Sequence, residues 1–163
     1  MFRKTLAIAL LGVTLTAPVL ARDAPPVHSI DVKTTLSDFN NPAAVVYWKF
    51  LDADLETAIA ALLVNRLGDR GLDLMIDMNE VELANAFETR TGMAQTTMSG
   101  RVKVYDKVEG RHFKTFDLKV TMGQALSIPP PGNEVKAVAR TNDQVYRALV
   151  TTFAQEVVNR MDN

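Results

Sequence analysis

The sequence contains no cysteine, and this absence excludes several kinds of chemistry. A thiol nucleophile, a thiolate metal site and a disulfide relay all require that side chain. Histidine is scarce, with two residues, and there is one tryptophan. An exported domain without disulfides depends on its hydrophobic core alone. The hydrophobic fraction of 47% and the charged fraction of 23% are typical of a globular domain that can form such a core.

The N-terminal apolar run is too short to span a bilayer, which requires about 20 apolar residues. Arg3 and Lys4 precede it, and Val19 and Ala21 occupy the minus-three and minus-one positions of a cleavage site. This pattern predicts a secretory signal peptide over residues 1–21, removed after Ala21. We expect a periplasmic protein, with secretion as the alternative.

Neither sign of charge is in excess, because 18 basic and 19 acidic residues give a formal net charge of −1. This balance does not favour nucleic acid or an anionic membrane as a partner. No later apolar run approaches membrane-spanning length, so we expect no transmembrane segment in the mature chain. The mature chain is predicted to have a flexible leader over residues 22–26 and a single domain over residues 27–163.

The segment after Asn41 has a clear helical pattern. Asn41 is a good N-cap, and Pro42 suits the first helical position because its missing N–H would be unpaired there. Apolar residues then recur at spacings of three and four, which predicts one amphipathic helix over residues 42–67, ended by the glycines that follow. The alternative is a short strand over residues 45–50, with Asp52 capping a shorter helix.

Four segments alternate apolar and polar side chains with the period of two that is typical of half-buried strands. They are the segment that begins at Val27 and residues 72–85, 98–106 and 112–122. The phase slips within the second segment, which predicts a bulge near Asn79. The predicted inward-facing residues are Ile30, Val32, Leu74, Ile76, Val102, Val104, Leu118 and Val120.

A capping box, with Thr141 at the cap and Gln144 three residues later, predicts the start of a C-terminal helix. Its apolar stripe repeats every four residues from Val145 to Met161. The element order β-α-β-β-β-α predicts an α+β fold, a two-layer sandwich in which a four-stranded, mostly antiparallel sheet carries two helices on one face. The other face is expected to be charged and exposed.

Three segments resemble a small α+β domain of uncharacterised envelope proteins and lipoproteins of Gram-negative bacteria. They are residues 55–67 with the glycine turns that follow, the strand over residues 100–106, and the closing helix over residues 145–161. The resemblance implies an α+β envelope domain and brings no catalytic residues. This chain differs from the lipoproteins because it lacks the cysteine that carries the lipid.

Paired carboxylates are the first candidate for chemistry. Asp73 and Asp77 share one strand face, and such pairs can transfer protons. Cross-strand ion pairs are the competing interpretation, with Arg101 and Lys103 on the next strand and Asp117 and Lys119 on the one after as the partners. A solvated ladder of charges is the favoured interpretation.

The two histidines are the second candidate. His28 and His112 lie near the ends of the first and fourth predicted strands, so a metal site would require those ends to meet beside a carboxylate. The nucleophile-elbow and nucleotide-binding motifs are missing from the sequence. We therefore expect no enzyme activity, with a hydrolase as a remote alternative, and we assign no catalytic residue, cofactor or metal.

Two pairs of apolar residues are candidates for either the core or a binding surface. Tyr47 and Trp48 are expected in the core, whereas Phe87 and Met93 lie in a predicted polar loop and are candidates for partner contact. We predict a non-enzymatic periplasmic envelope protein that binds another envelope protein or assists an assembly. The alternative is a carrier of a small apolar or amphiphilic ligand between helices and sheet, in a pocket lined by Trp48 and methionines.

Overall fold

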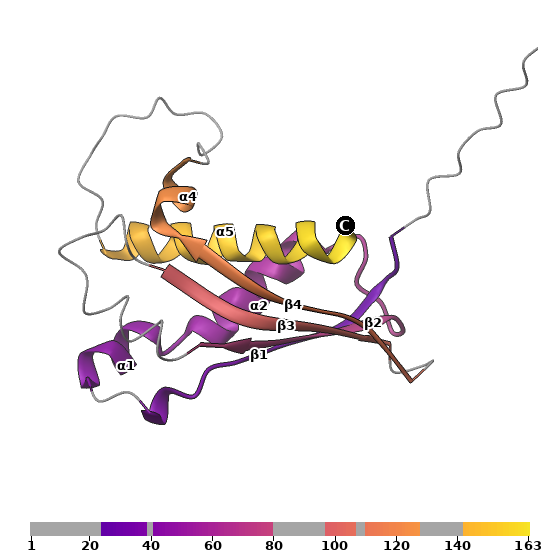
Figure 1. Ribbon diagram of the computed structural model, residues 1–163, viewed down its shortest axis with the longest axis horizontal. Coiled ribbons are helices and arrows are strands. Elements are labelled where there is room, and N and C mark those ends of the chain that lie inside the picture. Colours follow the sequence, from indigo (N-terminus) through magenta and orange to yellow (C-terminus); the bar gives the residue numbers. More distant parts are fainter. Residues whose placement is uncertain (1–23, 39–40, 80–96, 107–109, 128–141) are drawn as a thin grey trace, which may run out of the picture.

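The computed structural model describes residues 24–38, 41–79, 97–106, 110–127 and 142–163. Four strands form one sheet in the order β1-β2-β3-β4 (Figure 1). β1 (Val27–Lys33) pairs in parallel with β2 (Leu72–Met78), and β3 (Thr97–Asp106) and β4 (Arg111–Thr121) follow in antiparallel pairs. The predicted mostly antiparallel sheet is confirmed. Its one parallel pair is spanned by a helical crossover, as parallel neighbours require.

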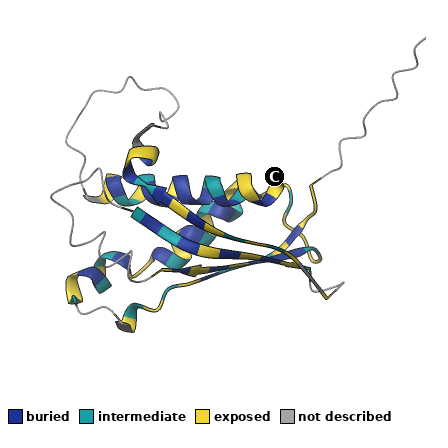
Figure 2. Ribbon diagram, viewed as in Figure 1, coloured by how far each residue is buried: buried dark blue, intermediate teal, exposed yellow. Residues whose placement is uncertain are grey.

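Helices cover one face of this sheet. α2 (Leu51–Leu62) lies against β1, and α5 (Asn142–Asp162) lies against β3 and β4 and contacts α2 (Figure 1). The predicted stripe of the C-terminal helix is buried throughout, at Val145, Leu149, Phe153, Val157 and Met161. Of the predicted inward-facing strand residues, seven are buried and Ile30 is partly buried against the same core. Figure 2 shows the buried positions between the two layers.

The predicted start of the first helix is confirmed. The side-chain oxygen of Asn41 accepts a hydrogen bond of 3.0 Å from the Ala43 N–H, and Pro42 is the first helical residue. The alternative strand over residues 45–50 is not formed, because α1 (Pro42–Trp48) occupies most of that segment.

The predicted single helix over residues 42–67 is wrong, because a turn at Lys49 and Phe50 separates α1 from α2. Trp48 and Leu51 keep the helical spacing of three residues across this turn, so the periodicity of apolar residues does not reveal the break. Trp48 is 1% exposed and Leu51 is fully buried. The turn is therefore compatible with burial of both side chains.

α2 ends at Leu62, before the glycines that were expected to stop it. The Val27 N–H donates to the Arg66 carbonyl at 2.7 Å, and the Gly68 N–H donates to the Val27 carbonyl at 3.0 Å. Leu67, predicted to lie on the apolar stripe, is 45% exposed. Pairing with the start of β1 replaces a further helical turn, because it satisfies backbone groups at an edge of the sheet.

A close approach of two chain segments requires glycine at position 71. Gly71 has φ of 146°, and a Cβ there would lie 2.3 Å from the carbonyl oxygen of Pro26. That oxygen accepts a hydrogen bond from the Leu72 N–H at 2.9 Å, and the neighbouring Pro25 carbonyl accepts one from Arg66 at 3.0 Å. Pro25 and Pro26, predicted to belong to a flexible leader, are thus hydrogen-bonded to the domain.

A short helix after β4 was not predicted. β4 ends at Thr121, and α4 (Met122–Ser127) begins at once. The Gln124 side chain accepts from the Thr121 N–H at 2.8 Å, and the Gln124 N–H donates to the Thr121 hydroxyl at 3.3 Å. This is a capping box, and its signal, a threonine with glutamine three residues later, is present in the sequence.

Candidate functional site

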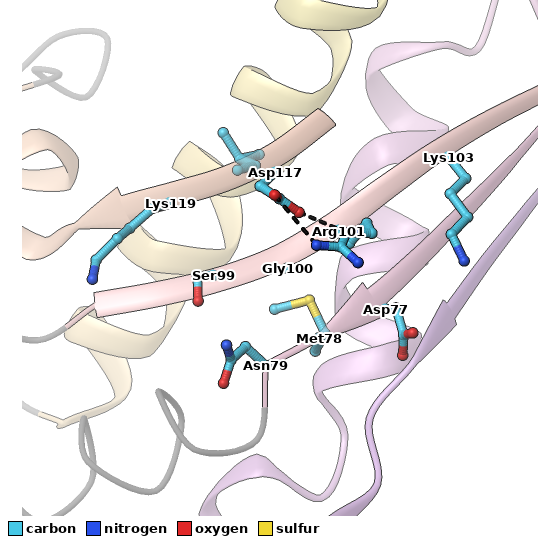
Figure 3. A pocket seen from close by; sticks show the side chains of 10 residues that line it. Asp77, Met78, Asn79, Ser99, Gly100, Arg101, Lys103, Asp117 and Lys119 are labelled. Carbon is cyan, nitrogen blue, oxygen red and sulfur yellow. Dashed lines mark hydrogen bonds and ion pairs between the residues drawn. The ribbon is translucent and has the colours of Figure 1, made fainter. Parts of the chain in front are cut away.

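The sheet face opposite α2 and α5, called here the outer face, is charged as predicted. In Figure 3 the helices lie behind the strands, and the charged side chains of Asp77, Arg101, Lys103, Asp117 and Lys119 lie in front. The charged residues that alternate with the core positions are four cations and four carboxylates: Lys33, Arg101, Lys103, Lys119, Asp31, Asp73, Asp77 and Asp117. The face is therefore balanced in formal charge.

One row of residues crosses all four strands with alternating charge. The strand register places Lys33 beside Asp77, Asp77 beside Arg101, and Arg101 beside Asp117. We call these four residues the charge row. The predicted cross-strand ion pair is confirmed for its last two members, since Arg101 Nε donates to Asp117 Oδ1 at 2.8 Å (Figure 3).

The Arg101–Asp117 pair is largely exposed, since the two side chains are 57% and 73% accessible to solvent. Its hydrogen bond lowers the pKa of Asp117 and raises the pKa of Arg101. Exposed pairs of this kind add little to stability because solvent and salt screen them. The charge row therefore has little structural purpose, and its charges are accessible to another molecule.

A hollow of about 570 Å³ lies over β2, β3 and β4 (Figure 3). Its lining includes three members of the charge row, Asp77, Arg101 and Asp117, together with Ser99 and Lys119. Small-molecule pockets are mostly apolar and enclose their ligand. A charged hollow on an open sheet face is better suited to side chains from a protein surface.

Apolar side chains are exposed beside these charges. Met75 is 40% exposed, Tyr105 is 38% exposed and Phe113 is 57% exposed. Met75 pairs in register with Lys103, and Tyr105 pairs with Asp73. A mixture of exposed aromatic and aliphatic groups with charged groups is typical of protein contact surfaces.

A buried carboxylate joins two residues of β1 at one end of the outer face. Asp73 is 2% exposed, and its Oδ1 lies 2.8 Å from His28 Nδ1 and accepts a hydrogen bond from the Ser29 hydroxyl. A register shift between Val27 and Ser29 accompanies this contact. A catalytic triad needs the histidine between serine and aspartate. Here the aspartate lies between the other two, so the arrangement orders the strand and does not activate the hydroxyl.

The sheet keeps the two histidines apart. β1, which carries His28, and β4, which carries His112, are at opposite edges. Three strand spacings, about 14 Å, separate them. Within the part of the chain that the structure describes, no three or more histidine or acidic side chains gather as metal ligands.

Side chains cap backbone groups at both edges of the sheet. At β1, Glu56 of α2 accepts from the Val32 N–H at 3.0 Å. At β4, the Arg160 guanidinium of α5 donates to the Asp117 carbonyl at 3.2 Å. Edges engaged in this way resist pairing with a strand from another chain. The outer face is thus the more available surface.

A groove of about 610 Å³ lies between α2 and α5. Ala58, Ala61 and Val150 provide apolar lining, and Tyr146 closes one end by donating to Asp54 Oδ2 at 2.6 Å. Burial, and then this hydrogen bond, raise the pKa of the Tyr146 phenol. The contact fixes the two helices to each other.

Neither of the two cavities described above has the lining predicted for a ligand carrier. Trp48 lies in the core as predicted, with its ring centroid 4.7 Å from that of Tyr47 and 5.8 Å from that of Tyr146. The buried methionines are Met78, Met98, Met122 and Met161. Neither the hollow nor the groove is lined by Trp48.

The predicted partner-contact residues, Phe87 and Met93, lie outside the described residues. The same is true of the signal peptide and of Thr141 in the predicted capping box. The segment that holds Phe87 and Met93 follows Asn79, which lines the hollow.

Comparisons of the chain with models of protein families, with curated proteins and with solved structures found no match. Among the helices in the described ranges, none is long and apolar enough to cross a membrane. Interpretation of the site therefore depends on its own geometry and charges.

Proposed function

We propose that this protein is a non-enzymatic interaction or assembly-accessory domain of the bacterial envelope, and that it contacts its partner through the outer face. The observation that carries the proposal is this sheet surface, which lies opposite the described helices α2 and α5. It combines the charge row, the hollow and the exposed side chains of Met75, Tyr105 and Phe113. Complementary charges on a partner would orient the contact, and the apolar groups would be removed from water.

The periplasmic location is part of the proposal, with secretion as the alternative. It is supported by the predicted signal peptide over residues 1–21 and by the resemblance to small α+β envelope domains. We include Phe87 and Met93 in the proposed contact because their segment continues from the rim of the hollow. Replacing both by serine is expected to weaken partner capture without changing thermal stability.

Site-specific cross-linking in cells tests the proposal. A photoreactive amino acid at Ser99, in the lining of the hollow, is expected to yield a discrete cross-linked product. The same amino acid at Thr151, in the groove between the helices, is the matched control and is expected to yield none. Products of equal yield from both positions, or no product from Ser99, would contradict the proposed contact surface.

A further inference from the structure

The order of charges on the outer face identifies a partner. From β1 to β4, the charge row is positive, negative, positive and negative, at Lys33, Asp77, Arg101 and Asp117. If a second copy of this row is placed opposite in the reverse order, from β4 to β1, each charge faces a charge of the opposite sign. We infer that the outer face binds the same face of a second copy of this chain, an inference that rests on the proposed function because it names the partner of that surface.

The charge row selects one orientation of the two copies. A two-fold axis parallel to the strands, between β2 and β3, reverses the row in the facing copy. Lys33 then lies opposite the partner's Asp117, and Asp77 lies opposite the partner's Arg101, with each pair formed twice. An axis parallel to the row would place like charges opposite each other, which is unfavourable.

The rest of the face agrees with this orientation. The neighbouring row lies two residues along the strands from the charge row and includes Met75 and Lys103. There, Met75 of β2 lies opposite the partner's Lys103, whose aliphatic stem can cover the thioether. Asp73 is 2% exposed and is engaged by His28, so it takes no part in the contact. The near balance of exposed cations and carboxylates limits net repulsion between copies. Two sheets packed in this way lie about 10 Å apart with strands roughly aligned.

The size of the face sets the expected affinity. Four strands of about 4.8 Å spacing and roughly seven residues of about 3.3 Å rise give a face of roughly 450 Å², or about 900 Å² for two copies. A standard interface buries about 1,600 Å². The dimer is therefore expected to be weak and to form only at high protein concentration. It is also expected to weaken with salt, which screens its ion pairs.

Charge reversal tests the inference by complementation. Each single variant, Lys33→Glu or Asp117→Lys, replaces both of its ion pairs between the copies by contacts of like charge. The dissociation constant of its dimer should therefore rise by roughly tenfold or more. A mixture of the two variants restores both pairs, since the new Glu faces the new Lys and the native Asp117 faces the native Lys33. Sedimentation velocity over a wide concentration range is expected to show dimer in the mixture and monomer in each variant alone.

Two further reversals serve as matched controls. Lys49→Glu and Asp69→Lys change exposed residues that lie on no strand, and both variants are expected to dimerise like the wild type. Circular dichroism and thermal melts establish that each variant is folded. The double variant with both reversals in one chain should dimerise by itself, which provides a second test of the pairing.

Two results would overturn the inference: a wild-type protein that stays monomeric at every concentration, or a mixture that does not associate when the wild type does. These outcomes are independent of the cross-linking test. A Ser99 product that contains a different protein would support the proposed function even if self-association failed. A Ser99 product of twice the chain mass is expected if the second copy is the partner.

Discussion

At the scale of single residues, one arginine joins the two ends of the described domain. Arg66 donates to both carboxylate oxygens of Asp162 at 2.8 Å and to the Pro25 carbonyl at 3.0 Å. The Arg66 side chain is 18% exposed, so this pair, formed by Nη1 with both carboxylate oxygens, is better shielded than the Arg101–Asp117 pair. The entry into β1 and the end of α5 therefore share one guanidinium.

Arg66→Ala is expected to lower the free energy of unfolding by about 1–2 kcal/mol, because the carboxylate and the carbonyl lose their shared donor. Arg66→Lys should recover only part of this loss, since one ammonium would replace the two nitrogens that donate to Asp162 and to Pro25. Urea denaturation measures both effects. Arg70→Ala, at an exposed residue of the same connection, is the control and should change stability by less than about 0.5 kcal/mol. An Arg66→Ala variant as stable as the wild type would contradict the assigned role.

Tyr146 predicts how stability changes in alkaline solution. Burial, with a further contribution from the Asp54 hydrogen bond, raises the pKa of its phenol above the ordinary value of about 10. In the unfolded chain this phenol ionises near pH 10, whereas in the folded chain it stays neutral. The contribution of the neutral phenol to the free energy of unfolding is therefore complete below about pH 10, and it is lost as the pH rises further.

Tyr146→Phe removes this ionisation and isolates its effect. The wild type is expected to lose more stability than the variant between about pH 8 and about pH 10.5. Denaturant unfolding at the two pH values measures the difference. Equal losses in the two proteins would show that the phenol is not shielded in the folded state.

At the scale of elements, each long helix contributes its stripe to one shared core. Leu55 of α2 and Leu149 of α5 are fully buried at the centres of their stripes. Leu62, on the last turn of α2, is 43% exposed. Burial therefore differs between leucines that the helical pattern treats alike.

Leu55→Ala and Leu149→Ala are each expected to cost about 2–5 kcal/mol, through lost burial and the cavity that remains. Leu62→Ala is the matched control on the same helix as Leu55, and it should cost less than about 1 kcal/mol. Thermal and denaturant unfolding measure all three. If either core substitution left stability unchanged, the corresponding helix would not pack on the sheet as described.

At the scale of the whole molecule, the described residues form a single core, and their helices cover one face of the sheet. The sequence has no cysteine, so no disulfide supports this core. The outer face combines exposed charges with exposed apolar side chains, and it is the surface on which the proposed function depends.

We expect the exported protein to consist of residues 22–163, cleaved after Ala21 and without an acyl group. The small residues at the cleavage site and the missing cysteine are the reasons. Intact mass spectrometry of the periplasmic fraction checks both expectations. A retained leader or an added lipid mass would show that the N-terminal segment is processed differently.

Local pattern by itself determined which residues form the strands and the closing helix and which of their faces are buried. Alternation places Val102 and Val104 inward, and the four-residue repeat identifies the stripe of α5, because side-chain direction has a fixed period in each element. The charged outer face was predictable for the same reason, and the Asn41 cap was predictable because its side-chain oxygen can accept from a free N–H at the start of the helix. A capping box at Thr121 was equally readable, although it was not used.

Only the tertiary structure decided how these elements end and which side chains meet. The turn at Lys49 and Phe50 and the early end of α2 depend on contacts with segments distant in sequence, which helical spacing does not record. The contact of Asp73 with His28 and the order of charges across the outer face depend on strand register. Register is set by packing of the whole core and by the bulge in β1, so alternation within a single strand does not specify it.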